Sequence, residues 1–357
     1  MARFHETGVF KREIITEDAA MAFVNSYQIP DRYNRADEVQ VGAVVGNDKV
    51  TNEGYGLPVV DMARLLDPEH REKEIAWLGS ACRDWGFFQL INHGVDEVVI
   101  EQMKGNTLQF FELPLEDKNS VAARPYSIEG FGHHFNRLST DKLEWAESML
   151  LNLQPTNERK IEFWPSKPPT FRDSIENYSK EMWNLATQLL TFMASDLGVD
   201  QETLLAAFRG KRQSSSLHRY PPCRHPEKVM GAAPHTDGLA LTILLHVDDT
   251  PGLQISKDGL WHPVQPLPGA FVINIGEILE VLTNGSYKSV LHRVLVDAER
   301  GRATIVVFHD ASIGGVVKPL PELGEARYRS IERPEFSKGF LRALSHGKER
   351  FLDTLKI

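Results

Sequence analysis

Two histidines and one aspartate within residues 233–308 have the types and the spacing of a metal centre. His235 and Asp237 stand two positions apart, and His292 follows 55 positions after Asp237. In an extended segment, residues i and i+2 project to the same face, so His235 and Asp237 can present an imidazole and a carboxylate to one point. A third ligand then has to come from another segment of the fold.

His292 suits that role because it follows an apolar, strand-like run from Tyr287 to Leu291, with enough chain before it to build several strands. Two histidines and one carboxylate on one face of a metal leave the opposite positions open, as in non-haem Fe(II) oxygenases. The H-x-D triplet alone is weak support, because a chain with 13 histidines and 49 acidic residues contains such triplets by chance.

Arg302 strengthens this prediction. It lies ten residues after His292 and two before Thr304, at the start of an apolar run that ends at Phe308, so we expect it to point inward from a core strand. Burying an arginine is costly unless an anion meets it. A structural ion pair could supply that anion, but no acidic residue stands beside Arg302 in the strand.

Further motifs extend over nearly the whole chain, and with them it resembles the plant-type 2-oxoglutarate- and Fe(II)-dependent dioxygenases. This family includes flavonoid, gibberellin and alkaloid oxygenases such as anthocyanidin synthase and codeine demethylase. None of the motifs specifies a substrate. They are Leu57-Pro58-Val59-Val60-Asp61, the run from Asp84 to Gly94, the run from Phe110 to Pro114, Tyr220-Pro221-Pro222-Cys223, the run from Pro251 to Gln254, and the run from Asn284 to Ser289.

Charge and coordination then suggest how the cofactors are held. Fe(II) with Asp237 and two neutral imidazoles leaves one positive charge and Arg302 adds another, which together balance a dicarboxylate such as 2-oxoglutarate. One carboxylate should chelate the iron, while the other should meet Arg302, with Thr304 donating a hydroxyl hydrogen bond. The resemblance implies that Tyr220 binds the iron-side carboxylate. It also implies O2 as co-substrate, succinate and CO2 as co-products, and ascorbate as reductant.

Four positions depart from the usual family pattern. Thr304 stands where serine is usual, Arg219 where a second tyrosine is common, and Glu277 where aspartate is frequent. His218 stands where asparagine is common. It lies two residues before Tyr220, on the same face of an extended segment, so we expect it to help hold the co-substrate. The alternative is that His218 only packs under the sheet.

Aromatic residues are the candidates for substrate contact. Phe308 lies two alternations beyond Thr304, and by resemblance it could stack on an aromatic substrate, the alternative being a core phenylalanine. Phe131 and Phe135 lie in the aromatic and glycine-rich stretch from Arg124 to Asn136, which could line a pocket or be an ordinary packed connection. Three other histidines lack a ligand-type neighbour and are expected to be structural or solvent-facing: His246, His262 and His309.

The elements that must position these residues are mainly strands. A β core is indicated by short apolar runs at 241–246, 271–275, 287–294 and 302–308, and by a hairpin around Asp258-Gly259. Such a number of short strands implies a closed or sandwiched all-β core, of which the double-sheet jelly roll is one solution, and the resemblance implies a distorted double-stranded β-helix. Flanking helices are expected at 69–85, 95–111 and, most clearly, 171–197, where apolar residues recur every three or four positions.

We expect one structural unit with four regions. Residues 1–55 form an N-terminal helical arm and linker, and residues 56–210 a mixed α/β region packed on the core. Residues 211–320 form the dioxygenase β core. Residues 321–357 form a C-terminal helical segment that packs over the barrel mouth.

Composition limits the possible partners. The chain has 357 residues and a formal net charge of −9 without a basic cluster, which argues against nucleic acid. Its two cysteines suit a reduced compartment, and no apolar run approaches membrane-spanning length. We therefore expect a cytoplasmic protein without membrane contact, monomeric or weakly homo-oligomeric, that acts on a small molecule.

The favoured function is an oxygenase that hydroxylates a small apolar or aromatic plant metabolite or hormone. The same iron site could instead catalyse O-demethylation or desaturation. A non-catalytic small-molecule-binding member of the fold is a second class, which loss of a ligand or of Arg302 would indicate, yet all four residues are present. A zinc enzyme with the same ligands is a third class, against which Arg302 and Thr304 argue.

Overall fold

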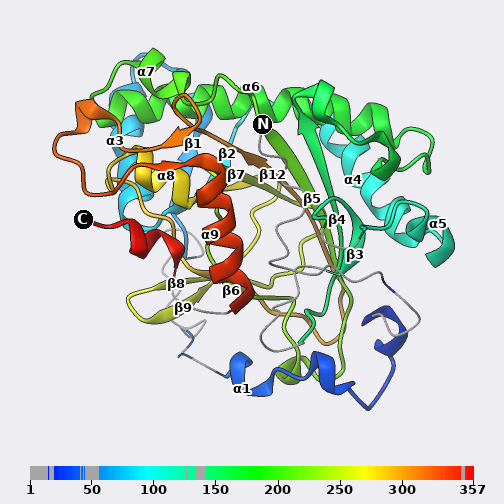
Figure 1. Cartoon of the computed structure of the whole chain (residues 1–357). Coiled ribbons are helices and arrows are strands. Elements are labelled where there is room, and N and C mark those ends of the chain that lie inside the picture. Colours follow the sequence, from blue (N-terminus) through cyan, green and yellow to red (C-terminus); the bar gives the residue numbers. More distant parts are fainter. Residues whose placement is uncertain are drawn as a thin grey trace.

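A computed structural model describes residues 15, 20–40, 42, 44, 56–124, 127–133, 142–346 and 350–357. Within these ranges, two main sheets face each other and helices cover the outer side of the larger one (Figure 1). The larger sheet has, in spatial order, β1 (Val59–Asp61), β2 (Phe87–Ile91), β10 (Phe271–Ile275), β7 (Leu241–His246), β12 (Arg302–His309), β5 (Gln213–Tyr220), β4 (Glu147–Gln154) and β3 (Gly130–His133). The smaller sheet has β6 (Ala232–His235), β11 (His292–Val294), β8 (Leu253–Lys257) and β9 (Leu260–Pro263).

The remaining elements lie around these sheets. A short ribbon pairs β13 (Val316–Val317) with β14 (Ile331–Glu332). The helices are α1 (Ala36–Val39), α2 (Met62–Leu66), α3 (Arg71–Asp84), α4 (Glu97–Glu112), α5 (Leu115–Asn119), α6 (Phe171–Leu197), α7 (Gln201–Ala206), α8 (Glu277–Leu282) and α9 (Arg333–His346). Together they form the expected double-stranded β-helix with flanking helices.

Strand β12 shows how the sheet separates core from site. Its residues alternate between the two faces, and Ile305 and Val307 are fully buried in the core shared with the helices. Arg302, Thr304 and Phe308 therefore project to the opposite face, toward the smaller sheet. The apolar alternation of one strand fixes the direction of all its polar residues.

Helix α6 confirms the clearest helix prediction. Its apolar stripe is buried against the outer face of the larger sheet, and it ends at Gly198, whose φ of 67° suits a left-handed cap. Figure 1 shows α6 running across that face. The stripe consists of Ile175, Tyr178, Met182, Leu185, Leu189 and Met193.

One strand prediction was wrong, and two strands were missed. The run from Tyr287 to Leu291 is not a strand, and β11 begins only at His292. Tyr287 is fully buried, and its hydroxyl donates to Asp196 (2.8 Å). This hydrogen bond ties the segment to α6. Strands β3 and β4 were not expected, and they extend the larger sheet beyond β5.

The terminal regions agree in part with expectation. In the N-terminal arm, the described residues include short helical turns at 20–23, 31–33 and 36–39, and residues 1–14, 16–19, 41, 43 and 45–55 lie outside the described residues. The C-terminal segment is helical, as expected, and α9 lies against the loop after β6, since a Cβ at Gly238 would be 2.6 Å from the Phe340 ring. The four-region division stays a prediction, as does the oligomeric state.

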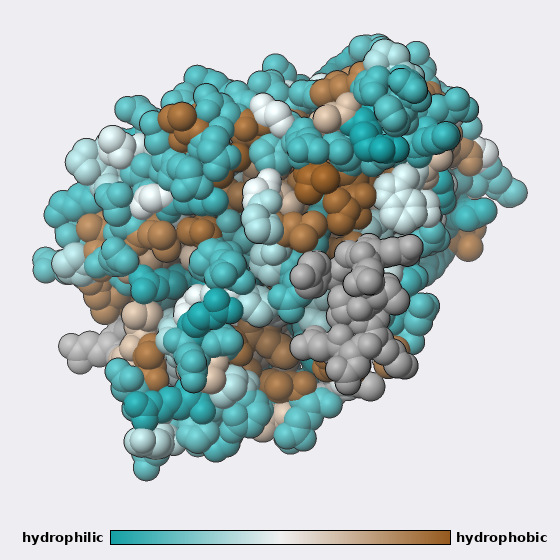
Figure 2. All heavy atoms as spheres, turned by 180° about the vertical axis from the view of Figure 1, so that it is seen from behind, coloured by the Kyte–Doolittle hydropathy of each residue, from teal (hydrophilic) through white to brown (hydrophobic). Residues whose placement is uncertain are grey.

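The outer surface is mostly hydrophilic. Figure 2 shows the face opposite to that of Figure 1, where apolar residues gather near the middle of a largely hydrophilic area. Among the described residues, no helix is both long and apolar enough to span a bilayer.

Glu129 provides a test of this packing. Its side chain accepts a hydrogen bond from the Asn152 amide (2.6 Å) and is buried, and burial raises the pKa of Glu129 to about 7 from 4.5. Between these pH values the folded chain keeps a proton that the unfolded chain has released. The free energy of unfolding should therefore fall as the pH rises through this window.

Glu129→Gln keeps an oxygen acceptor for Asn152 but cannot titrate. We expect the variant to lose this part of the pH dependence and to exceed the parent in stability at pH 8 by up to about 3 kcal/mol. Urea unfolding at about pH 4 and pH 8 measures the difference. The same stability difference at both pH values would contradict the assignment.

Candidate metal centre

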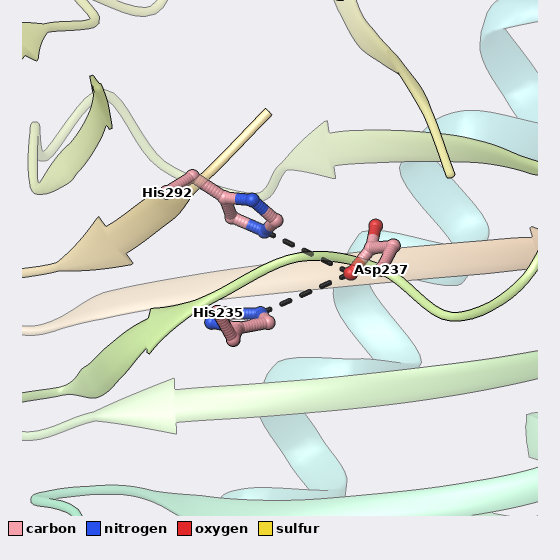
Figure 3. Close-up of side chains that lie close together, drawn as sticks. All are labelled: His235, Asp237 and His292. Atoms are coloured by element: carbon pink, nitrogen blue, oxygen red, sulfur yellow. Dashed lines mark ion pairs between the residues drawn. The ribbon is translucent and has the colours of Figure 1, made fainter. Parts of the chain in front are cut away.

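The three candidate ligands converge from two segments of the smaller sheet. His235 is the last residue of β6, Asp237 lies in the loop just after it, and His292 is paired directly opposite His235 at the start of β11. Both imidazole Nε2 atoms lie 3.8 Å from Oδ1 of Asp237. Figure 3 shows both rings directed at this carboxylate, as the sequence spacing predicts.

Backbone carbonyls fix the orientation of the two imidazoles. Nδ1 of His235 lies 2.8 Å from the Ala233 carbonyl oxygen, and Nδ1 of His292 lies 3.1 Å from that of Val290. Because a carbonyl only accepts hydrogen bonds, each Nδ1 carries a proton. The Nε2 of each ring is therefore the atom that would give its lone pair to a metal.

Two hydrogen bonds hold the carboxylate of Asp237 through the oxygen that does not face the imidazoles. Its Oδ2 accepts hydrogen bonds from the Thr242 hydroxyl (2.6 Å) and the Asn274 amide (2.8 Å), which leaves Oδ1 for the imidazole side. Burial alone would raise the pKa of Asp237. The charges of His292 and His235, together with these two hydrogen bonds, outweigh burial and hold that pKa below its ordinary value.

This donor set fits a divalent metal. Two atoms 3.8 Å apart can both lie about 2.1 Å from one ion, which is a typical metal–ligand distance. Two imidazoles and one carboxylate suit Fe(II), with open positions left for other molecules. His235, Asp237 and His292 could therefore hold the iron.

Arg302 marks the second end of the site. It is 3% exposed, and among the described residues no group makes a hydrogen bond of good geometry to its three guanidinium nitrogens or to the Thr304 hydroxyl. The Tyr220 hydroxyl lies close to both groups without that geometry. Asp248, whose charge reaches Arg302, accepts instead from the backbone N–H of Ala303 (2.7 Å). A buried cation beside a free hydroxyl is suited to an anionic ligand.

Tyr220 lies next to Arg302, and its expected contact with the iron-side carboxylate stays a prediction. It is paired with Arg302 across β5 and β12, and the guanidinium carbon lies 5.2 Å from its ring centroid. Burial raises the pKa of Tyr220 to about 12, against the opposing positive charge of Arg302. The phenol therefore stays protonated and can donate a hydrogen bond.

His218 lies between the two ends. It is buried, it is paired with Thr304 across the strands, and its Nδ1 lies 2.9 Å from the Ser148 hydroxyl oxygen. Its ring stacks on that of Tyr220 with centroids 5.9 Å apart. The position suits a role in holding the co-substrate, which stays a prediction.

The three aromatic candidates have different outcomes. Phe308 is on the site face, where it is paired with Thr242, the residue that holds Asp237. For Phe131 the sequence left open a pocket or an ordinary packed connection, and the side chain is fully buried on the helix side, 5.7 Å from Phe110 between ring centroids. Phe135 lies outside the described residues.

The sequence interpretation missed the residues that support the ligands. Thr242 and Asn274 are single polar residues within apolar strand runs, and that pattern could have identified them. Glu277 was noted only as a departure from the family. It accepts from the Thr236 hydroxyl (2.6 Å), and its N–H donates to the Asp237 carbonyl (2.8 Å), so it braces the ligand loop.

Comparison with known families agrees with this geometry. Residues 57–167 match the family described as "non-haem dioxygenase in morphine synthesis N-terminal". Residues 206–311, which contain the candidate ligands and Arg302, match the family described as "2OG-Fe(II) oxygenase superfamily".

Relatives resemble the chain over most of its length. A rice protein named 2-oxoglutarate-dependent dioxygenase 11 is 39% identical over 335 residues, which is 92% of each chain. Oxoglutarate-dependent flavonoid 7-O-demethylase 1 of Ocimum basilicum is 41% identical over 305 residues, or 84% of this chain and 82% of that protein. The crystal structure of JOX2 in complex with 2OG, Fe and JA superposes with a TM-score of 0.83 at 29% identity, covering 97% of this chain and 98% of that one.

Metal binding separates the candidate ligands from the residues that orient them. Alanine at His235, Asp237 or His292 should abolish Fe(II) binding and leave the fold intact. Thr242→Val or Asn274→Leu should weaken binding by about 10- to 100-fold, because the carboxylate loses its orientation. Anaerobic titration calorimetry with Fe(II) measures both effects.

His262→Ala on β9 is the matched control, since this histidine is outside the cluster. It should bind Fe(II) like the parent. Near-normal Fe(II) affinity after loss of one of the three candidate ligands would exclude that residue as a ligand.

Proposed function

The chain belongs to the 2OG-Fe(II) oxygenase superfamily, and we propose that it oxidises a small, largely apolar or aromatic metabolite, by hydroxylation in the default case. The observation that carries this proposal is the pairing of a His-Asp-His cluster with an uncompensated buried arginine on facing sheets. As a 2-oxoglutarate-dependent dioxygenase, it uses Fe(II), 2-oxoglutarate and O2. The substrate is a small molecule.

We assign the metal to His235, Asp237 and His292. When bound there, Fe(II) and 2-oxoglutarate supply the oxidising power, since decarboxylation of the co-substrate yields succinate and CO2 and one oxygen atom goes to the substrate. The protein contributes orientation. The Ala233 and Val290 carbonyls set the imidazole tautomers, while Thr242 and Asn274 present one carboxylate oxygen to the metal.

Arg302 and Thr304 would hold the far carboxylate of 2-oxoglutarate. The guanidinium offers a planar pair of donors and Thr304 a hydroxyl, and both are buried beside the donor Tyr220. Burial excludes competing water and strengthens these contacts. With the far end fixed, the other carboxylate and the keto oxygen are left to chelate the metal.

Phe308 would contact the substrate. It is on the site face beside Thr242, close to the metal end of the site, and it is partly exposed while the apolar residues of β12 on the helix side are fully buried. A flat apolar ring at this place favours an aromatic or alicyclic substrate. The basil relative, named a flavonoid 7-O-demethylase, supports an aromatic substrate.

Three outcomes of the same chemistry are distinguishable by product. Hydroxylation adds one oxygen to the substrate, whereas O-demethylation of a methoxy group releases formaldehyde and desaturation removes two hydrogens. A binding protein without turnover is the alternative class, and it would bind 2-oxoglutarate without releasing succinate. The intact ligand set and Arg302 favour an enzyme.

The experiment that tests this function is a substrate screen. Purified protein is incubated with Fe(II), ascorbate, O2 and 2-oxoglutarate labelled at its C1 carboxylate, against a panel of flavonoids, alkaloids and plant hormones. We expect labelled CO2 release that one compound class stimulates, with a product changed by one oxygen, one methyl or two hydrogens. No stimulation by any compound, with 2-oxoglutarate bound, would favour the binding protein.

Arg302→Ala should raise the 2-oxoglutarate requirement by roughly a hundred- to several-thousand-fold, because a buried charge partner is worth about 3–5 kcal/mol. Lysine should restore only part of the affinity, since it lacks the planar fork. The KM for 2-oxoglutarate in the CO2 assay measures both. Arg300→Ala is the control, because Arg300 is exposed and pairs with Asp249; an unchanged KM in Arg302→Ala would falsify the anchor.

Phe308→Ala should raise the KM for the substrate by about tenfold or more, because a stacked aromatic ring loses its partner. Calorimetric affinity for 2-oxoglutarate should stay within about twofold of the parent. Phe131→Leu, on the opposite face of the sheet, should lower stability without changing that KM. If Phe308→Ala leaves the substrate KM unchanged, the ring is only a core residue.

A further inference from the structure

His246 differs from the other histidines of the sheet. The sequence suggested a structural or solvent-facing role. His246 is the last residue of β7, and its side chain is buried, with 8% exposed. Within the described residues, neither of its ring nitrogens has a hydrogen-bond partner. A buried imidazole always carries at least one N–H, and leaving it unsatisfied costs free energy.

Its register places His246 at the Arg302 end of the site. It is paired directly with Thr304, so the two side chains lie on the same face of adjacent antiparallel strands. Thr304 is paired with His218 on its other side, and Tyr220 is next to Arg302 on β5. The β5 side of the pocket is therefore lined by Tyr220 and His218, and the β7 side by His246.

The unsatisfied donors at this end are clustered. Among the described residues, the buried polar atoms without partners include all three guanidinium nitrogens of Arg302, the Thr304 hydroxyl and both nitrogens of His246. A carboxylate has two oxygens with about four acceptor sites, so it can accept from several donors at once. One anion can therefore satisfy donors that approach from both neighbouring strands.

We infer that His246 donates a hydrogen bond to the far carboxylate of 2-oxoglutarate and closes the β7 side of the Arg302–Thr304 pocket. This assignment rests on the proposed function, since it concerns the same co-substrate. Burial, and next the positive charge of Arg302, hold the pKa of His246 well below its ordinary value, so the ring is a neutral donor. A neutral imidazole adds a hydrogen bond without adding a second positive charge beside Arg302.

The inference is tested by removing either partner of the proposed hydrogen bond. The protein is loaded anaerobically with Fe(II) and titrated in a calorimeter with 2-oxoglutarate or with 2-oxopentanoate, which keeps the chelating keto acid but lacks the far carboxylate. His246→Leu should weaken 2-oxoglutarate binding by about 10- to 100-fold, as expected for a hydrogen bond to a charged group. It should leave 2-oxopentanoate within about twofold of the parent.

Further variants complete the design. His246→Gln keeps an amide donor and should retain most of the 2-oxoglutarate affinity, and His246→Phe replaces the leucine variant if that one does not fold. His309→Leu is the matched control, because His309 is a fully buried histidine of the same sheet on the helix-facing side. It should affect both ligands equally or not at all.

The outcomes separate this inference from the proposed function. If His246→Leu or His246→Phe weakens the binding of both ligands equally, or of neither, His246 has only a packing role and the inference is wrong. Arg302→Ala in the same titration tests the function itself. Loss of 2-oxoglutarate affinity in Arg302→Ala, with none in His246→Leu, would overturn the role of His246 alone.

Discussion

An arginine buried at 3% exposure, with no hydrogen-bond partner among the described residues, is the constraint on which this structure depends. Ile305 and Val307 must face the helix side, so the alternation of β12 forces Arg302 and Thr304 into the space between the sheets. The nearby carboxylate of Asp248 is engaged by a backbone N–H and does not pair with the guanidinium. A dianionic co-substrate bound here would offset the cost of this buried charge and so link binding to stability.

The metal end also contains a buried charge, and here the charge is negative. Asp237 is a buried carboxylate that two imidazoles approach from one side, while Thr242 and Asn274 hold its other oxygen. These residues come from four strands and one loop, so only the paired sheets can bring them together. A small shift in the register of β6 against β11 would separate His235 from His292, which explains why both histidines lie on sheet backbone, with Asp237 in the loop directly after β6.

Much of this arrangement could be predicted from the sequence, because the chemistry is local. The His235–Asp237 pair, Arg302 with Thr304, and the stripe of α6 are each contained in one continuous segment. The failures concern facts that depend on pairing between segments. Phe131 could not be assigned to a face because its register against β4 is not visible in the sequence. The run that begins at Tyr287 is held to α6 by the Tyr287 hydroxyl, a contact that the sequence does not reveal.

The same reason explains why the sequence did not place Tyr220 and His246 at the Arg302 end. Tyr220 and His246 have no informative neighbours along the chain, and their significance comes from cross-strand partners on β12. The polar residues Thr242 and Asn274 carried a weak signal, since a single polar side chain in a buried strand requires a partner. That signal indicates a contact but not its identity.

The most direct measurement is a crystal structure of the anaerobic complex with Fe(II) and 2-oxoglutarate, with the iron located by its anomalous scattering. The account predicts one iron bonded to Nε2 of His235, Nε2 of His292 and Oδ1 of Asp237, and the far carboxylate of the co-substrate on Arg302. Iron held by other residues, or a co-substrate carboxylate that does not contact Arg302, would contradict it.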